Sequence, residues 1–151
     1  MIRTDRRIPL CTALVLLNLG FIWGNSLLPG EVSGALSDWV KGLLAMLLPG
    51  DGMETSGGGM LRKLAHFLEF ASLGALLSWW TIITGKKKWY ALCAGFLAAC
   101  VDETIQMFVP DRGPSLRDVG IDTCGVFAGM ILLKIGYELW KRKQSNSVGG
   151  K

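Results

Sequence analysis

Long apolar runs, separated by short charged joints, constrain this chain more than any other feature of its sequence. Four such runs lie near residues 8–28, 64–83, 89–109 and 119–140. Each has about the 20 residues that an α-helix needs to cross a bilayer. Because hydrocarbon leaves no partner for an unpaired backbone group, such runs predict helices rather than open strands. We therefore expect an all-α membrane protein built as a four-transmembrane-helix bundle.

The basic residues predict how this bundle is oriented. Lys and Arg gather in residues 1–7, in the tight turn 86–88 and in the tail 141–151. Cytoplasmic segments of membrane proteins carry an excess of these residues. Both termini are accordingly expected in the cytoplasm, with residues 8–140 forming one multi-pass membrane domain.

The segment 32–48, between the first two runs, has a different character. Its apolar side chains recur at helical spacing, whereas Asp38 and Lys41 fall off that stripe. Such an amphipathic segment is typical of a helix that lies in the membrane interface. We expect an outer interfacial helix here, followed by a glycine-rich outer loop over residues 49–60.

Composition narrows the function classes. The net charge of +4 would be compatible with a nucleic-acid partner. However, the sequence has no nucleic-acid-binding motif and no basic patch interleaved with aromatic residues. We therefore expect no nucleic-acid partner. The four cysteines lie in apolar runs without C-x-x-C spacing, which predicts free thiols.

Ionisable residues interrupt the apolar sequence between residues 101 and 124. Asp102 and Glu103 lie inside the third run, and Asp122 lies inside the fourth. A carboxylate at the bilayer centre costs about 2.5–3.5 kcal/mol on insertion scales. Such groups must be satisfied by one another, by water or by a ligand.

The predicted topology brings these groups to one place. The second span begins, the third ends and the fourth begins on the outer side, so their polar residues predict one outward-facing pocket. His66 and Glu69 are three residues apart, and Asp102 and Gln106 are four apart, so each pair shares a helix face. We expect the acids and the single histidine to lie deepest and the basic groups to lie nearer the surface. The predicted pocket residues are Lys63, His66, Glu69, Asp102, Glu103, Gln106, Arg112, Arg117, Asp118 and Asp122.

Four of these residues are candidates for catalysis. His66 with Glu69 has the composition of an acid–base pair in which the carboxylate orients the imidazole. Asp102 and Glu103 would then supply an acid. The same four side chains are, in an alternative interpretation, ligands for a divalent metal ion, since imidazole and carboxylates suit several metals.

The other six are candidates for substrate binding. The guanidinium groups of Arg112 and Arg117 match phosphate or carboxylate in a bidentate fashion. The remaining candidates in this set are Lys63, Gln106, Asp118 and Asp122. In the alternative interpretation, the basic groups only neutralise the carboxylates in a structural network.

Small and polar residues predict how the helices pack. Gly125-x-x-x-Gly129 in the fourth run and a set of small residues in the second offer surfaces for close helix approach. Asn18, in the middle of the first run, predicts a hydrogen bond between helices. The small residues of the second run are Ala71, Gly74, Ala75 and Ser78.

Three motifs resemble the VanZ-like family of small integral membrane proteins. They are K-x-x-H-F-x-E-F-x-x-L-G at residues 63–74, D-E-x-x-Q-x-F-x-P-x-R at residues 102–112 and D-V-x-x-D-x-x-G-x-x-x-G at residues 118–129. The resemblance implies a link to teicoplanin resistance in Gram-positive bacteria and a location in the bacterial plasma membrane. Two positions depart from the family pattern: Asp122 stands where Asn is usual, and Asp111 stands where Gly is common.

Two functional hypotheses follow. In the first, the pocket engages a lipid head group or a cell-envelope precursor and contributes to glycopeptide resistance. In the second, the protein is a membrane-embedded hydrolase or transferase that acts on phospholipid or on lipid-linked cell-wall intermediates. An ion-coupled transporter is a weaker alternative because four spans without an internal repeat suit alternating access poorly. The sequence decides neither catalysis nor the oligomeric state.

Overall fold

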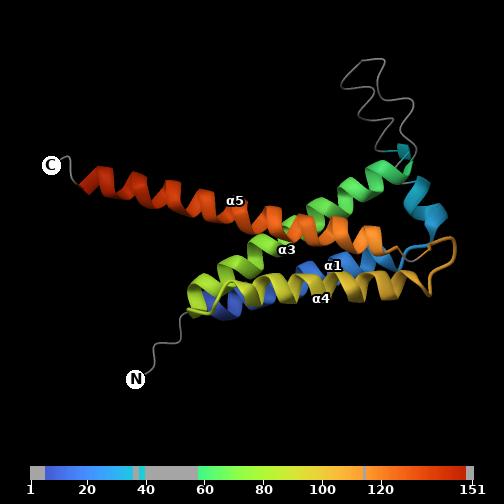
Figure 1. Ribbon diagram of the computed structural model, residues 1–151, viewed down its shortest axis with the longest axis horizontal. Coiled ribbons are helices and arrows are strands. Elements are labelled where there is room, and N and C mark those ends of the chain that lie inside the picture. Colours follow the sequence, from blue (N-terminus) through green and yellow to red (C-terminus); the bar gives the residue numbers. More distant parts are fainter. Residues whose placement is uncertain (1–5, 36–37, 40–57, 114, 149–151) are drawn as a thin grey trace, which may run out of the picture.

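The computed structural model describes residues 6–35, 38–39, 58–113 and 115–148, and all regular structure in these ranges is helical (Figure 1). The four long helices are α1 (Arg7–Ser26), α3 (Gly58–Thr84), α4 (Trp89–Gln106) and α5 (Leu116–Val148). A short helical segment at residues 30–35 follows α1. The four helices pack side by side, and α3 with α5 forms the most extensive pairing. The all-α prediction is confirmed for the described residues.

Three of the described helices are long and apolar enough to cross a membrane, namely α1, the part of α3 from Met60 to Thr84, and the part of α5 from Leu116 to Ser145. Helix α4 is not among them, because Asp102, Glu103 and Gln106 make its last turns polar. The fourth span therefore stays a prediction. So does the interfacial helix at 32–48, of which residues 36–37 and 40–48 lie outside the described part.

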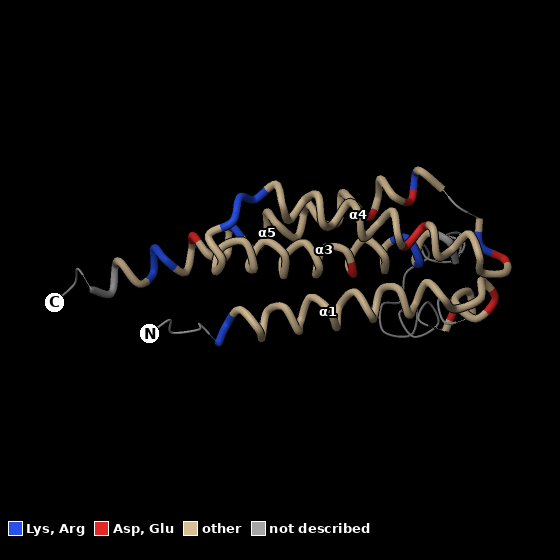
Figure 2. Tube along the Cα trace, turned by 90° about the horizontal axis from the view of Figure 1, so that it is seen from below, with Lys and Arg blue, Asp and Glu red and all other residues tan. Residues whose placement is uncertain are grey.

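Charge is distributed unevenly between the two ends of the bundle. Acidic and basic residues mix where α1 ends, α3 begins, α4 ends and α5 begins (Figure 2). The opposite end, with the start of α1 and the turn between α3 and α4, is mainly basic (Figure 2). The mixed end is therefore where the predicted pocket residues lie.

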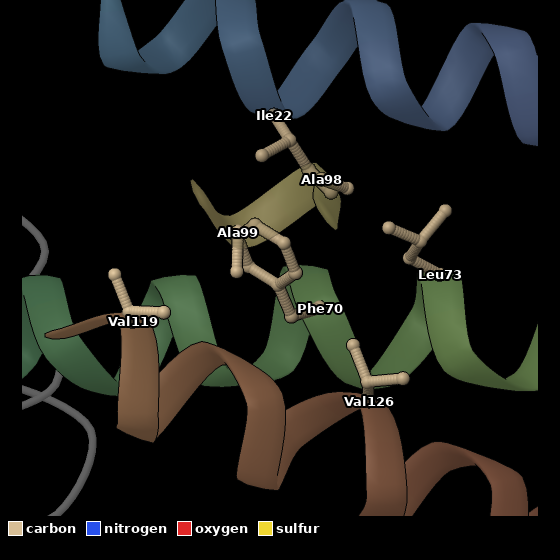
Figure 3. Close-up of a cluster of buried hydrophobic side chains, with 7 residues drawn as sticks. All are labelled: Ile22, Phe70, Leu73, Ala98, Ala99, Val119 and Val126. Carbon is tan, nitrogen blue, oxygen red and sulfur yellow. The ribbon is translucent and has the colours of Figure 1, made fainter. Parts of the chain in front are cut away.

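A small hydrophobic core joins all four helices (Figure 3). Phe70 of α3 is fully buried and lies between side chains of α4 and α5. Large apolar side chains on the outward faces remain exposed, for example Leu17 at 70% and Leu132 at 66%. A bilayer would cover such faces. The core residues are Ile22, Phe70, Leu73, Ala98, Ala99, Val119 and Val126.

Glycines let the backbones of α3 and α5 come into contact. A Cβ atom added to Gly129 would lie 1.8 Å from the carbonyl oxygen of Ala71. One added to Gly74 would lie 2.1 Å from the carbonyl oxygen of Val126. Only a residue without a side chain fits at these two positions, so the predicted small-residue packing is confirmed.

Polar contacts and cysteines also follow the predictions. Asn18 of α1 donates a hydrogen bond from Nδ2 to Oγ of Ser72 on α3, at 2.7 Å. This is the predicted bond between helices. All four cysteines are free thiols, and Cys11 is buried, with its Sγ 3.6 Å from the carbonyl oxygen of Leu76.

Candidate functional site

Buried polar side chains from the ends of α1, α3, α4 and α5 meet at the mixed-charge end of the bundle. Asp102 is completely buried, and Asp122 is 2% exposed. Glu103, Gln106 and Arg112 are also buried. Because buried ionised groups are stable only when they are paired or hydrogen-bonded, the contacts of each group decide what the cluster can do.

The connection between α4 and α5 is tied to the bundle at both of its ends. Asp111 adopts the left-handed conformation, with a φ of 59°, which turns the chain sharply. The carbonyl oxygen of Pro110 accepts a hydrogen bond from the backbone of Gly30 at 3.2 Å. Oε1 of Glu103 accepts a hydrogen bond from the backbone N–H of Ser115, just before α5 begins. The loop therefore holds Arg112 over the end of α1.

The guanidinium of Arg112 is only partly satisfied by the protein. Its Nη2 donates to the carbonyl oxygen of Asn25 at 3.2 Å. Its Nε and Nη1 are buried and find no hydrogen-bond partner among the described residues. Burial lowers the pKa of Arg112, and the charge of nearby Arg62 lowers it further. A buried guanidinium with unused donors beside a second cation is a favourable position for an anion. The sequence placed Arg112 nearer the surface than the structure does.

Glu69 is held by the first helix. Nδ2 of Asn25 donates to Oε1 of Glu69 at 2.8 Å. The other carboxylate oxygen of Glu69, Oε2, is 3.8 Å from Nδ1 of His66. That separation is too long for a hydrogen bond. The predicted pair is adjacent, but its members do not touch directly.

Asp102 and Gln106 form the predicted contact within α4. Nε2 of Gln106 donates to Oδ2 of Asp102 at 2.8 Å and also lies 3.3 Å from Oγ of Ser26 on α1. The same Oδ2 is 3.9 Å from Nδ1 of His66. Among the described residues, neither Oδ1 of Asp102 nor Nδ1 of His66 has a hydrogen-bond partner. Both atoms therefore retain bonding capacity inside the protein.

Two predicted binding residues lie at the rim. Nζ of Lys63 is 3.0 Å from Oδ1 of Asp118, and 39% and 23% of the two side chains are exposed. Lys63 therefore joins α3 to α5 rather than reaching toward Arg112. Arg117 is exposed and lines neither of the two cavities described below.

A cavity of about 240 Å³ opens between the end of α1, the start of α3 and the loop before α5. Its polar wall contains Arg62 and Arg112. Its apolar wall contains leucines, of which Leu64 and Leu68 are more than half exposed. The cavity therefore combines a positively charged wall with an apolar wall. The polar lining residues are Asn25, Ser33, Arg62, His66, Glu69 and Arg112.

A second cavity, of about 10 Å³, lies between α3, α4 and α5. His66, Gln106 and Asp122 line it from the three helices. Beside it, His66, Asp102 and Asp122 offer ligand atoms that all lie within 4.8 Å of one another. The set of metal ligands predicted from the sequence shares His66 and Asp102 with this group. The group contains Asp122, whereas the predicted set contained Glu69 and Glu103.

Sequence reasoning missed three residues of the site. Arg62 lines both cavities, and Asn25 and Ser26 hold Glu69 and Gln106 from α1. The signal for Arg62 was present, because it precedes His66 by four residues and so shares its helix face. Nothing in the spacing within α1 could have indicated the partners of Asn25 and Ser26, because these contacts join segments far apart in the chain.

Comparison with known proteins adds one finding. A family model described as VanZ/LLP1 matches residues 11–137. The match covers all four long helices in large part and includes every candidate residue above. No curated protein and no solved structure matches the chain.

Proposed function

Because the chain belongs to the VanZ/LLP1 family, whose model spans most of it, we propose that it works as a multi-pass membrane protein that binds the phosphate of a lipid head group. The phosphate comes from a membrane phospholipid or from a lipid-linked cell-envelope precursor. In a bacterial plasma membrane, with both termini in the cytoplasm, the cavity would open to the outer leaflet. Sequestering such a precursor there contributes to glycopeptide resistance of the teicoplanin type.

The unsatisfied guanidinium of Arg112 is the observation that supports this proposal most. Two of its donors have no hydrogen-bond partner in the described part of the chain. They belong to a residue that lines the larger cavity together with Arg62. The guanidinium group of an arginine can donate two parallel hydrogen bonds to the oxygens of one phosphate. A phosphate would also offset the electrostatic repulsion between Arg62 and Arg112.

The leucines of the same cavity support a lipid as the source of the phosphate. Leu64 and Leu68 lie on the outward face of α3, 52% and 58% exposed. They adjoin the polar wall of the cavity. A phosphate placed at Arg112 would leave the acyl or prenyl chain of the lipid along this leucine face. At about 240 Å³ the cavity is large enough for a head group but not for a whole lipid.

Replacing Arg62 tests the proposal without disturbing the more deeply buried Arg112. Arg62→Gln should weaken binding of phosphatidylglycerol and of a polyprenyl phosphate by about tenfold or more, because a hydrogen bond to a charged group contributes about 1.5–3 kcal/mol. Native mass spectrometry of the detergent-purified full chain measures both ligands. The stronger of the two signals identifies the source of the phosphate.

Arg117→Gln is the matched control, because it removes the same charge from the same end of the bundle but outside both cavities. This variant should bind as the wild type does and should preserve teicoplanin tolerance in cells that lose it with Arg62→Gln. Equal losses in the two variants would mean that only general electrostatic attraction is at work, which would contradict a head-group site.

A membrane-embedded hydrolase or transferase is the second candidate function. His66 favours it, because this residue lines both cavities and its Nδ1 lies within 3.9 Å of two carboxylates. It would act as base or nucleophile, with Glu69 orienting it and with Asp102 and Glu103 as acids. His66→Gln should then abolish turnover of radiolabelled phospholipid or lipid-linked precursor in nanodiscs while binding persists. A wild-type protein that binds these lipids and releases no product would exclude catalysis on them.

A further inference from the structure

A second group of side chains can bind a cation, whereas the arginine-lined cavity suits an anion. This group consists of His66, Asp102 and Asp122. They come from three different helices, α3, α4 and α5, and their ligand atoms lie within 4.8 Å of one another. Metal–ligand distances near 2.0–2.2 Å place the ligands of one ion about 3–4 Å apart, so small side-chain rotations would close the group around an ion.

Unused bonding capacity points to a ligand at this place. Asp102 is completely buried, yet its Oδ1 has no hydrogen-bond partner in the described residues. Nδ1 of His66 is likewise buried and unpartnered there. The other oxygen of the Asp102 carboxylate, Oδ2, accepts from Gln106 and lies 3.9 Å from Nδ1 of His66, so the unpartnered nitrogen and the carboxylate of Asp102 are close without sharing a hydrogen bond.

The charge around the group also favours a cation. Glu69, Asp102, Glu103, Asp118 and Asp122 supply five carboxylates, whereas the neighbouring cations are Arg62, Lys63 and Arg112. Acidic side chains around the group therefore outnumber basic ones, five to three. A divalent cation would stabilise the ionised form of these carboxylates in a region where a membrane penalises it.

The small cavity adjoins the group, although Asp102 does not line it and Arg62 and Lys63 do. It measures about 10 Å³ and has His66 and Asp122 in its wall. That volume suits one water molecule or one ion. It is lined on one side by Gln106, which already donates to Asp102 and so fixes the orientation of that carboxylate.

We propose that His66, Asp102 and Asp122 bind one divalent transition-metal ion of the Zn²⁺ or Mn²⁺ kind. An imidazole ligand favours these ions over Mg²⁺ and Ca²⁺, and the two carboxylates disfavour the soft ion Cu⁺. Three protein ligands leave coordination positions open for water or for an oxygen of a bound anion. The proposal does not depend on the head-group function, because Arg112 takes no part in the ligand set.

The test uses the full-length protein, purified in detergent without an oligohistidine tag, stripped with a chelator and then equilibrated with Mn²⁺ or Zn²⁺. We expect one ion per chain by elemental analysis. Asp102→Asn and Asp122→Asn should each weaken binding by about 100-fold or more, since even the loss of an outer partner of a metal ligand costs about 10–100-fold. Glu138→Gln, which removes an exposed carboxylate from the same helix as Asp122, should bind as the wild type does.

The wild type alone gives an independent answer if a variant fails to fold. The chain has one histidine, so nitrogen coupling in the pulsed electron-spin-resonance spectrum of bound Mn²⁺ must come from His66. Coupling to one nitrogen is expected. Failure to retain an ion, a spectrum without nitrogen coupling, or equal retention by folded Asp102→Asn and Asp122→Asn would overturn the proposal.

Discussion

Gly129→Leu is expected to separate α3 from α5 and to destabilise the whole bundle. Even a Cβ atom at this position would lie 1.8 Å from the carbonyl oxygen of Ala71, and backbone cannot move aside as a side chain can. Overpacking inside a well-packed protein typically costs about 1–3 kcal/mol, and this contact lies at the upper end or beyond. Thermal unfolding of the purified protein, followed by fluorescence-detected size exclusion, measures the loss.

Gly136→Leu is the control for this substitution. It makes the same chemical change in the same helix, but apart from the backbone of its own turns no described atom lies within 4 Å of a Cβ atom added there. Its stability should equal or slightly exceed that of the wild type, because leucine favours a helix more than glycine does. If both variants unfold at the wild-type temperature, the close approach of α3 and α5 is not part of the native packing.

The small-residue faces through which α3 and α5 meet could be predicted from the sequence because their determinants are local. Gly125 and Gly129 lie one turn apart on one helix, so their shared face follows from helix geometry alone. The same holds for the contact between Asp102 and Gln106 within α4. Where four-residue spacing carries the information, the sequence is enough to place two side chains together.

The position of a residue around its helix explains one miss. Arg62 and Lys63 are neighbours in sequence, but successive residues point about 100° apart around a helix, since 3.6 residues make one turn. Both residues line the small cavity, but Arg62 also lines the larger cavity near α1, whereas Lys63 pairs with Asp118 on α5. The sequence analysis named Lys63 and not Arg62 as a binding candidate because it could not tell which helices flank α3.

Contacts between segments that are distant in the sequence could not be predicted for a different reason. Asn25 and Glu69 are 44 residues apart, and their hydrogen bond depends on where α1 lies against α3. The loop residue Arg117 was predicted to share a site with Arg112 because both lie in the same short connection. The loop geometry buries Arg112 and leaves Arg117 in the open.

Asn25→Asp is the second substitution for which we expect a large effect. The change preserves shape but replaces the amide that donates to Oε1 of Glu69, at 2.8 Å, with a carboxylate. Two carboxylates would then face each other at this half-buried contact without an amide donor between them. An uncompensated charge costs about 3–5 kcal/mol when it is fully buried, so the variant should lose thermal stability by up to that amount.

The double variant Asn25→Asp with Glu69→Gln decides whether the lost contact is the cause. Its glutamine can donate to the new aspartate, so the hydrogen bond returns with its direction reversed and the same total charge. Glu69→Gln alone should be nearly neutral, because its amide oxygen still accepts from Asn25. Stability restored in the double variant would identify a direct coupling of α1 to α3. A double variant that is no more stable than Asn25→Asp would show that the loss of stability does not come from the contact between Asn25 and Glu69.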